Sequence, residues 1–204
     1  MGHVSGNFGL TGGVASGKTT VARMFEALGA RIIDADQLGH ELLRAASRAY
    51  QEVLAQFGRE ILDASGEINR GRLAALVFAE PSRLAALNAI LHPKILNRVE
   101  EIAAEYRAVE PAAVILVEAA LIYEAEVEDR LAKVIVAWCR PEQQIARLVA
   151  KTGMSRAEAE RRIAVQMPVE EKRRRADCVI DCSGSVEDSR ARVQTVYSDL
   201  KELF

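Results

Sequence analysis

The residues Gly12-Gly13-Val14-Ala15-Ser16-Gly17-Lys18-Thr19 match the pattern G-x-x-x-x-G-K-[ST] in full. The glycines let the backbone wrap closely around an anion, with its N–H groups pointing inward. Lys18 supplies a mobile cation for the β- and γ-phosphates, and Thr19 supplies a hydroxyl for Mg²⁺. The sequence therefore predicts a loop that binds the phosphates of ATP, with Thr19 as the metal ligand, formed by Gly12, Gly13, Val14, Ala15, Ser16, Gly17, Lys18, Thr19 and Thr20.

The flanks of this loop distinguish a phosphate site from a chance glycine-rich turn. A short apolar stretch, Phe8–Thr11, predicts a strand that runs directly into the glycines. After the loop, Val21, Met24 and Phe25 recur at helical spacing, and Gly29 predicts the end of that helix. The positive end of the helix dipole would then point at the bound phosphates, which favours the phosphate site.

Further apolar runs predict the rest of a sheet. Ala113–Val117 and Val134–Ala137 are dense in branched residues and do not alternate with polar ones. Such runs are typical of parallel strands that are covered on both faces. Shorter strands are predicted at Arg31–Ile33 and Cys178–Ile180, and a closing helix follows the last of them.

Two stretches of the chain are helical and contain no strand runs. They cover about residues 37–108 and 141–175. Within the first, Pro81-Ser82 predicts a helix start. Within the second, Ser155-Arg156-Ala157-Glu158 is a capping-box pattern that predicts another helix start, and Pro168 predicts the end of that helix. Both stretches follow strand ends, where parallel sheets bind ligands, so we expect a parallel α/β core with two helical insertions.

Composition excludes several kinds of partner. The formal net charge is -2, whereas a protein that tracks nucleic-acid phosphates usually carries a basic excess. No apolar run approaches the roughly 20 residues that span a bilayer. The 3 cysteines are odd in number and widely spread, which is unlike a disulfide framework. We therefore expect a cytoplasmic protein that binds neither nucleic acid nor membrane.

Three classes of phosphate-loop protein compete at this point. A switch GTPase normally carries an Asn-Lys-x-Asp segment, which this sequence lacks. A motor-type ATPase usually has an acid that closes an apolar strand, and Glu118 occupies such a position without deciding the matter. A kinase needs an acceptor pocket, a base for the acceptor hydroxyl and a basic lid that excludes water.

An acidic pair and a basic segment supply those kinase features. Asp34-Ala35-Asp36 ends the second predicted strand, close to the phosphate loop if the first two strands are near neighbours. One carboxylate would support Mg²⁺ and the other would accept the hydroxyl proton, while the alternative is a turn with a helix N-cap. Both can hold, with Asp34 structural and Asp36 catalytic. The basic segment runs from Arg147 to Arg175. A solvated helical hairpin is the alternative to a lid there, and Arg147 with Lys151 is one pair that would face the triphosphate.

Several of these motifs, taken in order, resemble the dephospho-coenzyme A kinase family nearly from end to end. The resemblance rests on Phe8–Thr20, Ile33–Asp36, Phe57-Gly58, Leu73–Phe78, Leu87–Pro93, Leu121–Glu124, Gln144–Leu148, Gln166–Lys172 and Ala176-Asp177. Three positions depart from the family pattern, which usually has Pro at Ala120, Asn at Cys182 and a second lid arginine at Lys151.

The resemblance implies a P-loop kinase-like parallel sheet flanked by helices, in a single domain over residues 1–204. Its core would be about 1–36, 112–140 and 176–204, with an acceptor-binding helical lobe at about 37–111 and a lid at about 141–175. It implies that ATP phosphorylates the ribose 3′-hydroxyl of dephospho-coenzyme A. Asp36 would be the general base, Lys18 the γ-phosphate clamp and Arg147 the lid arginine.

Two alternatives remain open from the sequence. One is another small-molecule kinase on the same core, of the nucleoside or shikimate type. The other, from a different class, is a nucleotide-dependent regulatory or assembly protein, which would keep the phosphate loop without an acceptor base and lid. We expect a monomer or a weak homo-oligomer.

Overall fold

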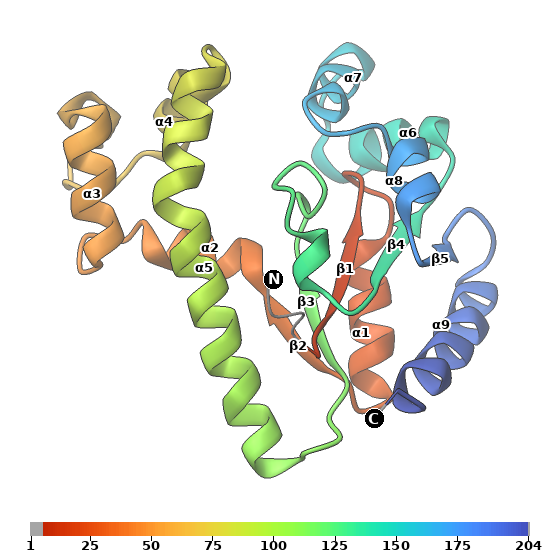
Figure 1. The fold of residues 1–204 in the computed structure, drawn as a ribbon. Helices are drawn as coiled ribbons and strands as arrows, with labels where there is room; N and C mark the ends of the chain where they lie inside the picture. Colours follow the sequence, from red (N-terminus) through yellow and green to blue (C-terminus); the bar gives the residue numbers. More distant parts are fainter. Residues whose placement is uncertain (1–5, 204) are drawn as a thin grey trace. The chain divides into compact units, whose positions relative to one another are not determined.

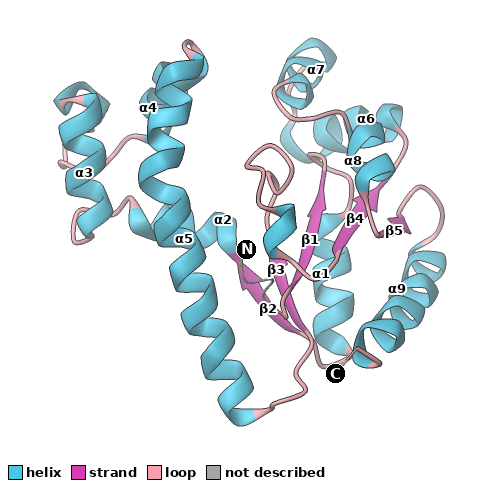
Figure 2. Ribbon diagram, in the orientation of Figure 1, coloured by secondary structure: helices cyan, strands magenta, loops and turns pink. Residues whose placement is uncertain are grey.

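The computed structural model describes residues 6–203, so residues 1–5 and 204 of the predicted core lie outside it. Five strands form one sheet in the order β2-β3-β1-β4-β5 (Figures 1 and 2). The pairs β1–β3, β1–β4 and β4–β5 are parallel. The strands are β1 (Phe8–Gly12), β2 (Arg31–Asp34), β3 (Ile115–Glu118), β4 (Val134–Trp138) and β5 (Cys178–Asp181). Every residue of β1, β3 and β4 is buried, as apolar runs without alternation predict.

Helices connect these strands and form the two insertions. The first insertion contains α2 (Ala35–Leu42), α3 (Arg48–Phe57), α4 (Arg70–Phe78) and α5 (Pro81–Val109), with a short 3₁₀ turn at Arg59–Ile61. The remaining helices are α1 (Lys18–Ala27), α6 (Pro141–Thr152), α7 (Arg156–Ala164), α8 (Val169–Arg175) and α9 (Val186–Lys201), and a second 3₁₀ turn covers Glu128–Arg130.

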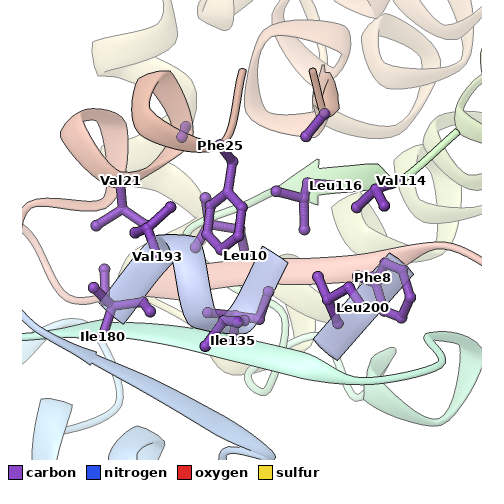
Figure 3. Close-up of a cluster of buried hydrophobic side chains, with 14 of the residues drawn as sticks. Phe8, Leu10, Val21, Phe25, Val114, Leu116, Ile135, Ile180, Val193 and Leu200 are labelled. Atoms are coloured by element: carbon purple, nitrogen blue, oxygen red, sulfur yellow. The ribbon is translucent and has the colours of Figure 1, made fainter. Parts of the chain in front are cut away.

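The main core lies between the sheet and the helices α1 and α9. Leu10 and Ile135 of the sheet pack there with Phe25 of α1 and Val193 of α9 (Figure 3). Each large apolar side chain buried in this way contributes roughly 1.5–3 kcal/mol. Alternate residues of β4, such as Val136, join a second cluster on the opposite face, because successive side chains of a strand point to opposite sides. The sheet is therefore covered on both faces.

The chain divides into two compact units. One holds the described residues up to Ile33 and from Ala103 onward. It contains the sheet apart from Asp34, the last residue of β2, and also the segment predicted as a lid. The other is Asp34–Ile102, a helical unit with its own apolar core, which includes Tyr50, Phe57 and Leu91. The role of this second unit as an acceptor-binding lobe stays a prediction.

The first two strands are near neighbours that are not paired, because β3 lies between β1 and β2 in the sheet. One expectation from the sequence needs correction. Pro168 does not end the helix that begins after Ser155. That helix, α7, ends at Ala164, and Pro168 is the N-cap of α8. A proline fits there because a helix start does not need its missing N–H and its φ is already suitable.

The capping box at the start of α7 is confirmed. The Ser155 side chain accepts a hydrogen bond from the Glu158 N–H, and the Glu158 carboxylate accepts one from the Ser155 N–H. Within residues 6–203, no helix combines the length and the apolar character needed to cross a membrane.

Candidate nucleotide-binding site

A cavity of about 440 Å³ lies over the loop between β1 and α1. All nine residues predicted to bind the nucleotide line it, from Gly12 to Thr20. Arg147 and Lys151 of α6 line the same cavity, so the structure brings the predicted lid pair to the phosphate loop. Asp36 is half-buried in the first turn of α2 and belongs to the other unit.

The backbone of the loop explains its glycines. Gly17 has φ 106°, in the left-handed region that glycine tolerates. A Cβ at Gly12 would lie 2.5 Å from the carbonyl oxygen of Ala137, and a Cβ at Gly13 would lie 2.2 Å from Gln144 Nε2. Ala15 also has a positive φ, 58°, at a cost of about 1–2 kcal/mol for a residue with a Cβ. The surrounding contacts must therefore hold the loop in this shape.

The Lys18 ammonium is held by the acid that ends β3. Lys18 Nζ lies 2.9 Å from Glu118 Oε1, and the two side chains are only 16% and 9% exposed. Such a pair keeps the cation oriented at the strand ends, where its electrostatic effect is larger than in bulk water. Glu118, which the sequence left undecided, therefore belongs to this site.

The basic residues of the lid segment have different surroundings. Arg147 Nη2 donates to the carbonyl oxygen of Cys182 over 2.7 Å, at the edge of the cavity. Arg156 instead pairs with Glu142 and Glu160 on the exposed surfaces of α6 and α7. The solvated-hairpin alternative is therefore correct for Arg156, whereas Arg147 lies at the cavity.

Lys172 of α8 is buried and paired. Its ammonium lies 2.8 Å from Glu124 Oε1 and donates to the carbonyl oxygen of Ala120 over 2.6 Å. The same Glu124 oxygen accepts from the Met167 N–H at 2.9 Å, and the Ala120 carbonyl also accepts from the Thr11 hydroxyl at 3.2 Å. Lys172 thus connects α8 to the segment after β3 and to the strand that leads into the phosphate loop.

Two other cations of α8 pack on aromatic rings. The Arg173 guanidinium lies 4.2 Å from the centre of the Trp138 ring, and that of Arg175 lies 4.5 Å from the Tyr123 ring. Burial, reinforced by a nearby acid, raises the pKa of Tyr123 to about 12, so this ring stays neutral. These contacts pack α8 against β4 and against the segment that follows β3, and neither guanidinium lines the nucleotide cavity.

The end of the cavity next to Cys182 is built from small side chains and backbone. Cys182, Gly184, Ser185 and Val186 line it, and the sequence drew attention only to Cys182, as a departure from the family pattern. The Cys182 N–H donates to the Trp138 carbonyl over 2.7 Å. Burial raises the pKa of the Cys182 thiol, which is therefore neutral beside the phosphate loop. The backbone contacts of this position do not depend on its side chain.

In the acidic pair at the start of α2, Asp34 takes the capping role. Asp34 Oδ1 accepts a hydrogen bond from the Gln37 N–H at 2.8 Å and caps the helix. Asp34 is therefore structural, as the N-cap alternative predicts. Asp36 follows within the first turn, on a backbone that this cap has fixed.

The oxygen donors at the loop fit Mg²⁺. Thr19 is exposed and lines the cavity, and the Glu118 carboxylate lies beside Lys18. Within residues 6–203, no group of three or more His, Cys, Asp and Glu side chains is placed to hold a metal ion. Mg²⁺ commonly takes one or two protein oxygens together with substrate phosphates and water.

Comparisons with known proteins point to one family. The family model for dephospho-CoA kinase matches residues 7–188. A dephospho-CoA kinase of Geobacter sulfurreducens is 44% identical over 191 residues, which are 93% of this chain and 96% of that protein. The one from Carboxydothermus hydrogenoformans is 40% identical over 193 residues, 95% of this chain and 93% of the relative.

Solved structures share the fold. The crystal structure of TT1252 from Thermus thermophilus has a TM-score of 0.79 at 32% identity, and the match covers 98% of this chain and 99% of that one. A dephospho-CoA kinase from Campylobacter jejuni has a TM-score of 0.66 at 25% identity, with 97% and 98% covered. A shikimate kinase from Bacteroides thetaiotaomicron, at a TM-score of 0.52 and 17% identity over 96% and 98% of the chains, shares the fold alone. The predicted parallel sheet of the P-loop kinase type is confirmed.

Proposed function

Because this chain belongs to the dephospho-CoA kinase family, we propose that its phosphate loop, Asp36 and Arg147 divide the work of one phosphoryl transfer. The reaction is the ATP-dependent phosphorylation of the ribose 3′-hydroxyl of dephospho-coenzyme A, which gives coenzyme A and ADP as the last step of coenzyme A biosynthesis. The observation that carries the proposal is the single cavity at which the complete phosphate loop meets Arg147 and Lys151.

The phosphate loop binds the donor. Its backbone N–H groups and the N-terminus of α1 hold the phosphates, and Lys18 exchanges part of its contact with Glu118 for the γ-phosphate. Charge grows on the γ-phosphoryl oxygens in the transition state, so a cation placed there lowers the barrier more than it strengthens binding. Held by Thr19 and supported by Glu118, Mg²⁺ would neutralise phosphate charge in the same place.

Asp36 serves as the general base. Its carboxylate takes the proton from the 3′-hydroxyl as that oxygen attacks the γ-phosphorus. The bond from the γ-phosphorus to the β–γ bridging oxygen breaks, and the bridging oxygen leaves with ADP. The support for this role is that Asp34 already caps α2, so the turn does not need the Asp36 carboxylate as an N-cap.

Arg147 stabilises the transferred phosphoryl group from the lid. We expect Arg147→Ala to lower kcat by about ten- to a hundredfold, since a hydrogen bond to a charged group is worth about 1.5–3 kcal/mol. Arg147→Lys should recover part of this loss, because lysine keeps the charge without the planar fork. Steady-state assays with Arg156→Ala as a control give the comparison, and a normal rate for Arg147→Ala would assign the lid's role to other cations.

A hollow within the helical unit fits the acceptor's diphosphate. It has a volume of about 240 Å³ and is lined by Gln37, His40, Leu43, Arg44, Glu67, Ile68 and Arg70. His40 follows Asp36 by one turn of α2, and residues four apart on a helix share a face at about 5–6 Å. In dephospho-coenzyme A the diphosphate is attached to the ribose 5′-oxygen, on the same sugar as the 3′-hydroxyl. We place that diphosphate near Arg44 and Arg70.

Removing these arginines should weaken binding of the acceptor and leave binding of ATP unchanged. We expect Arg44→Ala and Arg70→Ala each to raise KM for dephospho-coenzyme A by about tenfold, because each removes a charge-assisted contact worth about 1.5–3 kcal/mol. The KM for ATP should change less than twofold. Arg48→Ala removes a neighbouring arginine whose side chain is 92% exposed, and it provides the matched control. Equal rises in both KM values would contradict the assignment.

The remaining expectations concern the setting of the enzyme. The three cysteines are free thiols, which suits a reducing compartment and supports a cytoplasmic location. The net charge of -2 favours a small-molecule acceptor over nucleic acid as the partner. A monomer or weak homo-oligomer remains the expected state, which light scattering across a concentration series would measure.

An acceptor panel tests the proposed function. Wild-type protein with Mg-ATP is incubated with dephospho-coenzyme A, adenosine or shikimate at equal concentrations, and the products are separated by chromatography. Dephospho-coenzyme A should be turned over fastest. Preferred turnover of adenosine or shikimate would favour another small-molecule kinase, and no transfer to any acceptor would favour a regulatory protein.

A further inference from the structure

Two glutamine side chains form hydrogen bonds with the backbone of one residue of the phosphate loop, Val14. Gln144 of α6 donates from Nε2 to the Val14 carbonyl oxygen over 2.7 Å. Gln166, between α7 and α8, accepts from the Val14 N–H at Oε1 over 3.0 Å. Both glutamines come from the lid segment, more than a hundred residues after the loop, and all of these atoms belong to the same compact unit.

The buried position of Gln144 shows that these contacts are specific. Gln144 is only 1% exposed, and a buried amide is tolerated when its polar atoms are hydrogen-bonded. Its Nε2 occupies the space into which a Cβ at Gly13 would project, so the second glycine of the motif makes room for this side chain. The glutamine and the glycine therefore form one fitted contact.

The loop needs such support at this point. Ala15, the next residue after Val14, has a φ of 58°, which the backbone of a residue with a Cβ adopts at a cost. Other contacts on this stretch are the Ser16 N–H to the Gly13 carbonyl, 3.1 Å, and the Cys139 thiol to the Ala15 carbonyl, 3.9 Å. The two glutamines add direct bonds to both backbone polar groups of Val14.

We propose that Gln144 and Gln166 are positioning residues that hold Val14 and thereby pre-shape the phosphate loop for ATP. A loop fixed before binding loses less conformational freedom when the nucleotide enters, which raises affinity. Gln166 also joins the lid to the loop, so the two elements that surround the triphosphate are connected before the substrate binds. The inference rests on the proposed function only in that the kinase uses this loop.

The two positions make opposite chemical demands. Position 144 must donate a hydrogen bond and position 166 must accept one, and the glutamine amide can do either. Gln166→Glu keeps an acceptor oxygen for the Val14 N–H, whereas Gln166→Leu removes it. Gln144→Leu removes the donor and leaves the Val14 carbonyl without this partner. The pair of substitutions at Gln166 therefore separates the hydrogen bond from the shape of the side chain.

The first measurement is amide hydrogen exchange at Val14 in nucleotide-free protein, where the added charge of a glutamate does not meet phosphates. We expect faster exchange in Gln166→Leu than in the wild type, and protection close to the wild type in Gln166→Glu. Gln194→Leu, on the exposed surface of α9, should leave exchange unchanged as the matched control.

The second measurement is the Kd for ATP. Leaving a buried backbone group unpaired costs about 1–3 kcal/mol, which corresponds to a Kd about 5- to 150-fold higher. We expect Gln144→Leu to lie toward the upper end, because its site is buried, and Gln166→Leu toward the lower end. The KM for dephospho-coenzyme A should stay within twofold in both variants.

Two results would overturn the proposal. The first is wild-type ATP affinity in both leucine variants together with unchanged Val14 exchange in Gln166→Leu. The second is a lower Tm with an unchanged Kd for the folded protein, which would assign the glutamines to stability alone. If Gln144→Leu does not fold, the Gln166 pair decides, because that residue lies outside the helices. Failure of the wild type to phosphorylate dephospho-coenzyme A would reject the proposed function while leaving both comparisons valid.

Discussion

Lys18→Ala is expected to lower kcat by about 10²- to 10³-fold, the range typical of a lost group that stabilises transition-state charge. The lysine lies 2.9 Å from Glu118 and is only 16% exposed in its side chain. It is the one basic residue in the loop sequence from Gly12 to Thr20, so the loop itself offers no equivalent charge. Because the γ-phosphoryl oxygens gain charge during transfer, the loss should be larger in kcat than in the Kd for ATP. Pre-steady-state transfer from labelled ATP measures the effect.

The control for this substitution is the partner carboxylate. Lys18→Ala leaves Glu118 largely buried without its cation, and breaking a buried pair can destabilise the fold. Glu118→Gln removes that charge, so the double variant Lys18→Ala/Glu118→Gln should recover stability in thermal unfolding without recovering kcat. A double variant with near-normal turnover would show that Lys18 acts by neutralising Glu118 and not on the phosphate.

Asp36→Asn is expected to lower kcat by about 10²-fold or more while ATP binding stays nearly intact, as the loss of a general base predicts. Asparagine has almost the same shape as aspartate but does not accept the hydroxyl proton. The nucleotide cavity is lined by residues of the other unit, so the Kd for ATP should change little. Turnover and equilibrium nucleotide binding are measured on the same preparation.

The matched control lies two residues earlier in the chain. Asp34 caps α2 through the Gln37 N–H, and asparagine caps a helix about as well as aspartate. Asp34→Asn should therefore keep both kcat and stability close to the wild type. Unchanged turnover in Asp36→Asn would reduce Asp36 to a residue of the helix start, and an equal loss in both variants would point to the charge of the turn and not to a base.

Local sequence signals predicted the phosphate loop and the sheet well. Gly12 and Gly17 are required by close backbone contact and by a left-handed φ, and both demands appear directly in the motif. The strands β3 and β4 could be predicted from the sequence because strands buried on both faces are apolar throughout. The order of the strands could not be predicted from the sequence, because the position of β3 between β1 and β2 follows from packing across the whole sheet.

Buried polar residues could not be found from the sequence. Lys172 stands in a run of basic residues that all look solvent-exposed, yet it is buried against Glu124 and Ala120. Gln144 and Gln166 likewise carried no sign of their contacts with Val14. A charge or an amide is apparent in the sequence, whereas its burial depends on partners that only the fold brings together.

Backbone contacts explain how the site tolerates two of the three departures from the family pattern. Ala120 acts through its carbonyl oxygen, which accepts from Lys172 and Thr11, so its replacement of proline leaves these bonds possible. Cys182 bonds Arg147 through its carbonyl and Trp138 through its N–H. The site therefore keeps its geometry although these two side chains differ from the family's usual ones.

The central claim is that one cavity binds ATP and delivers its γ-phosphoryl group to the 3′-oxygen of dephospho-coenzyme A. Its most direct test measures the stoichiometry of phosphoryl transfer and the position of the new phosphate. Phosphorus NMR monitors both in a reaction of the protein with Mg-ATP and dephospho-coenzyme A. We predict one ADP for each coenzyme A formed, with the new phosphate on the 3′-oxygen and negligible ADP without the acceptor. ADP release that does not depend on dephospho-coenzyme A, or a phosphate at another position, would contradict the account.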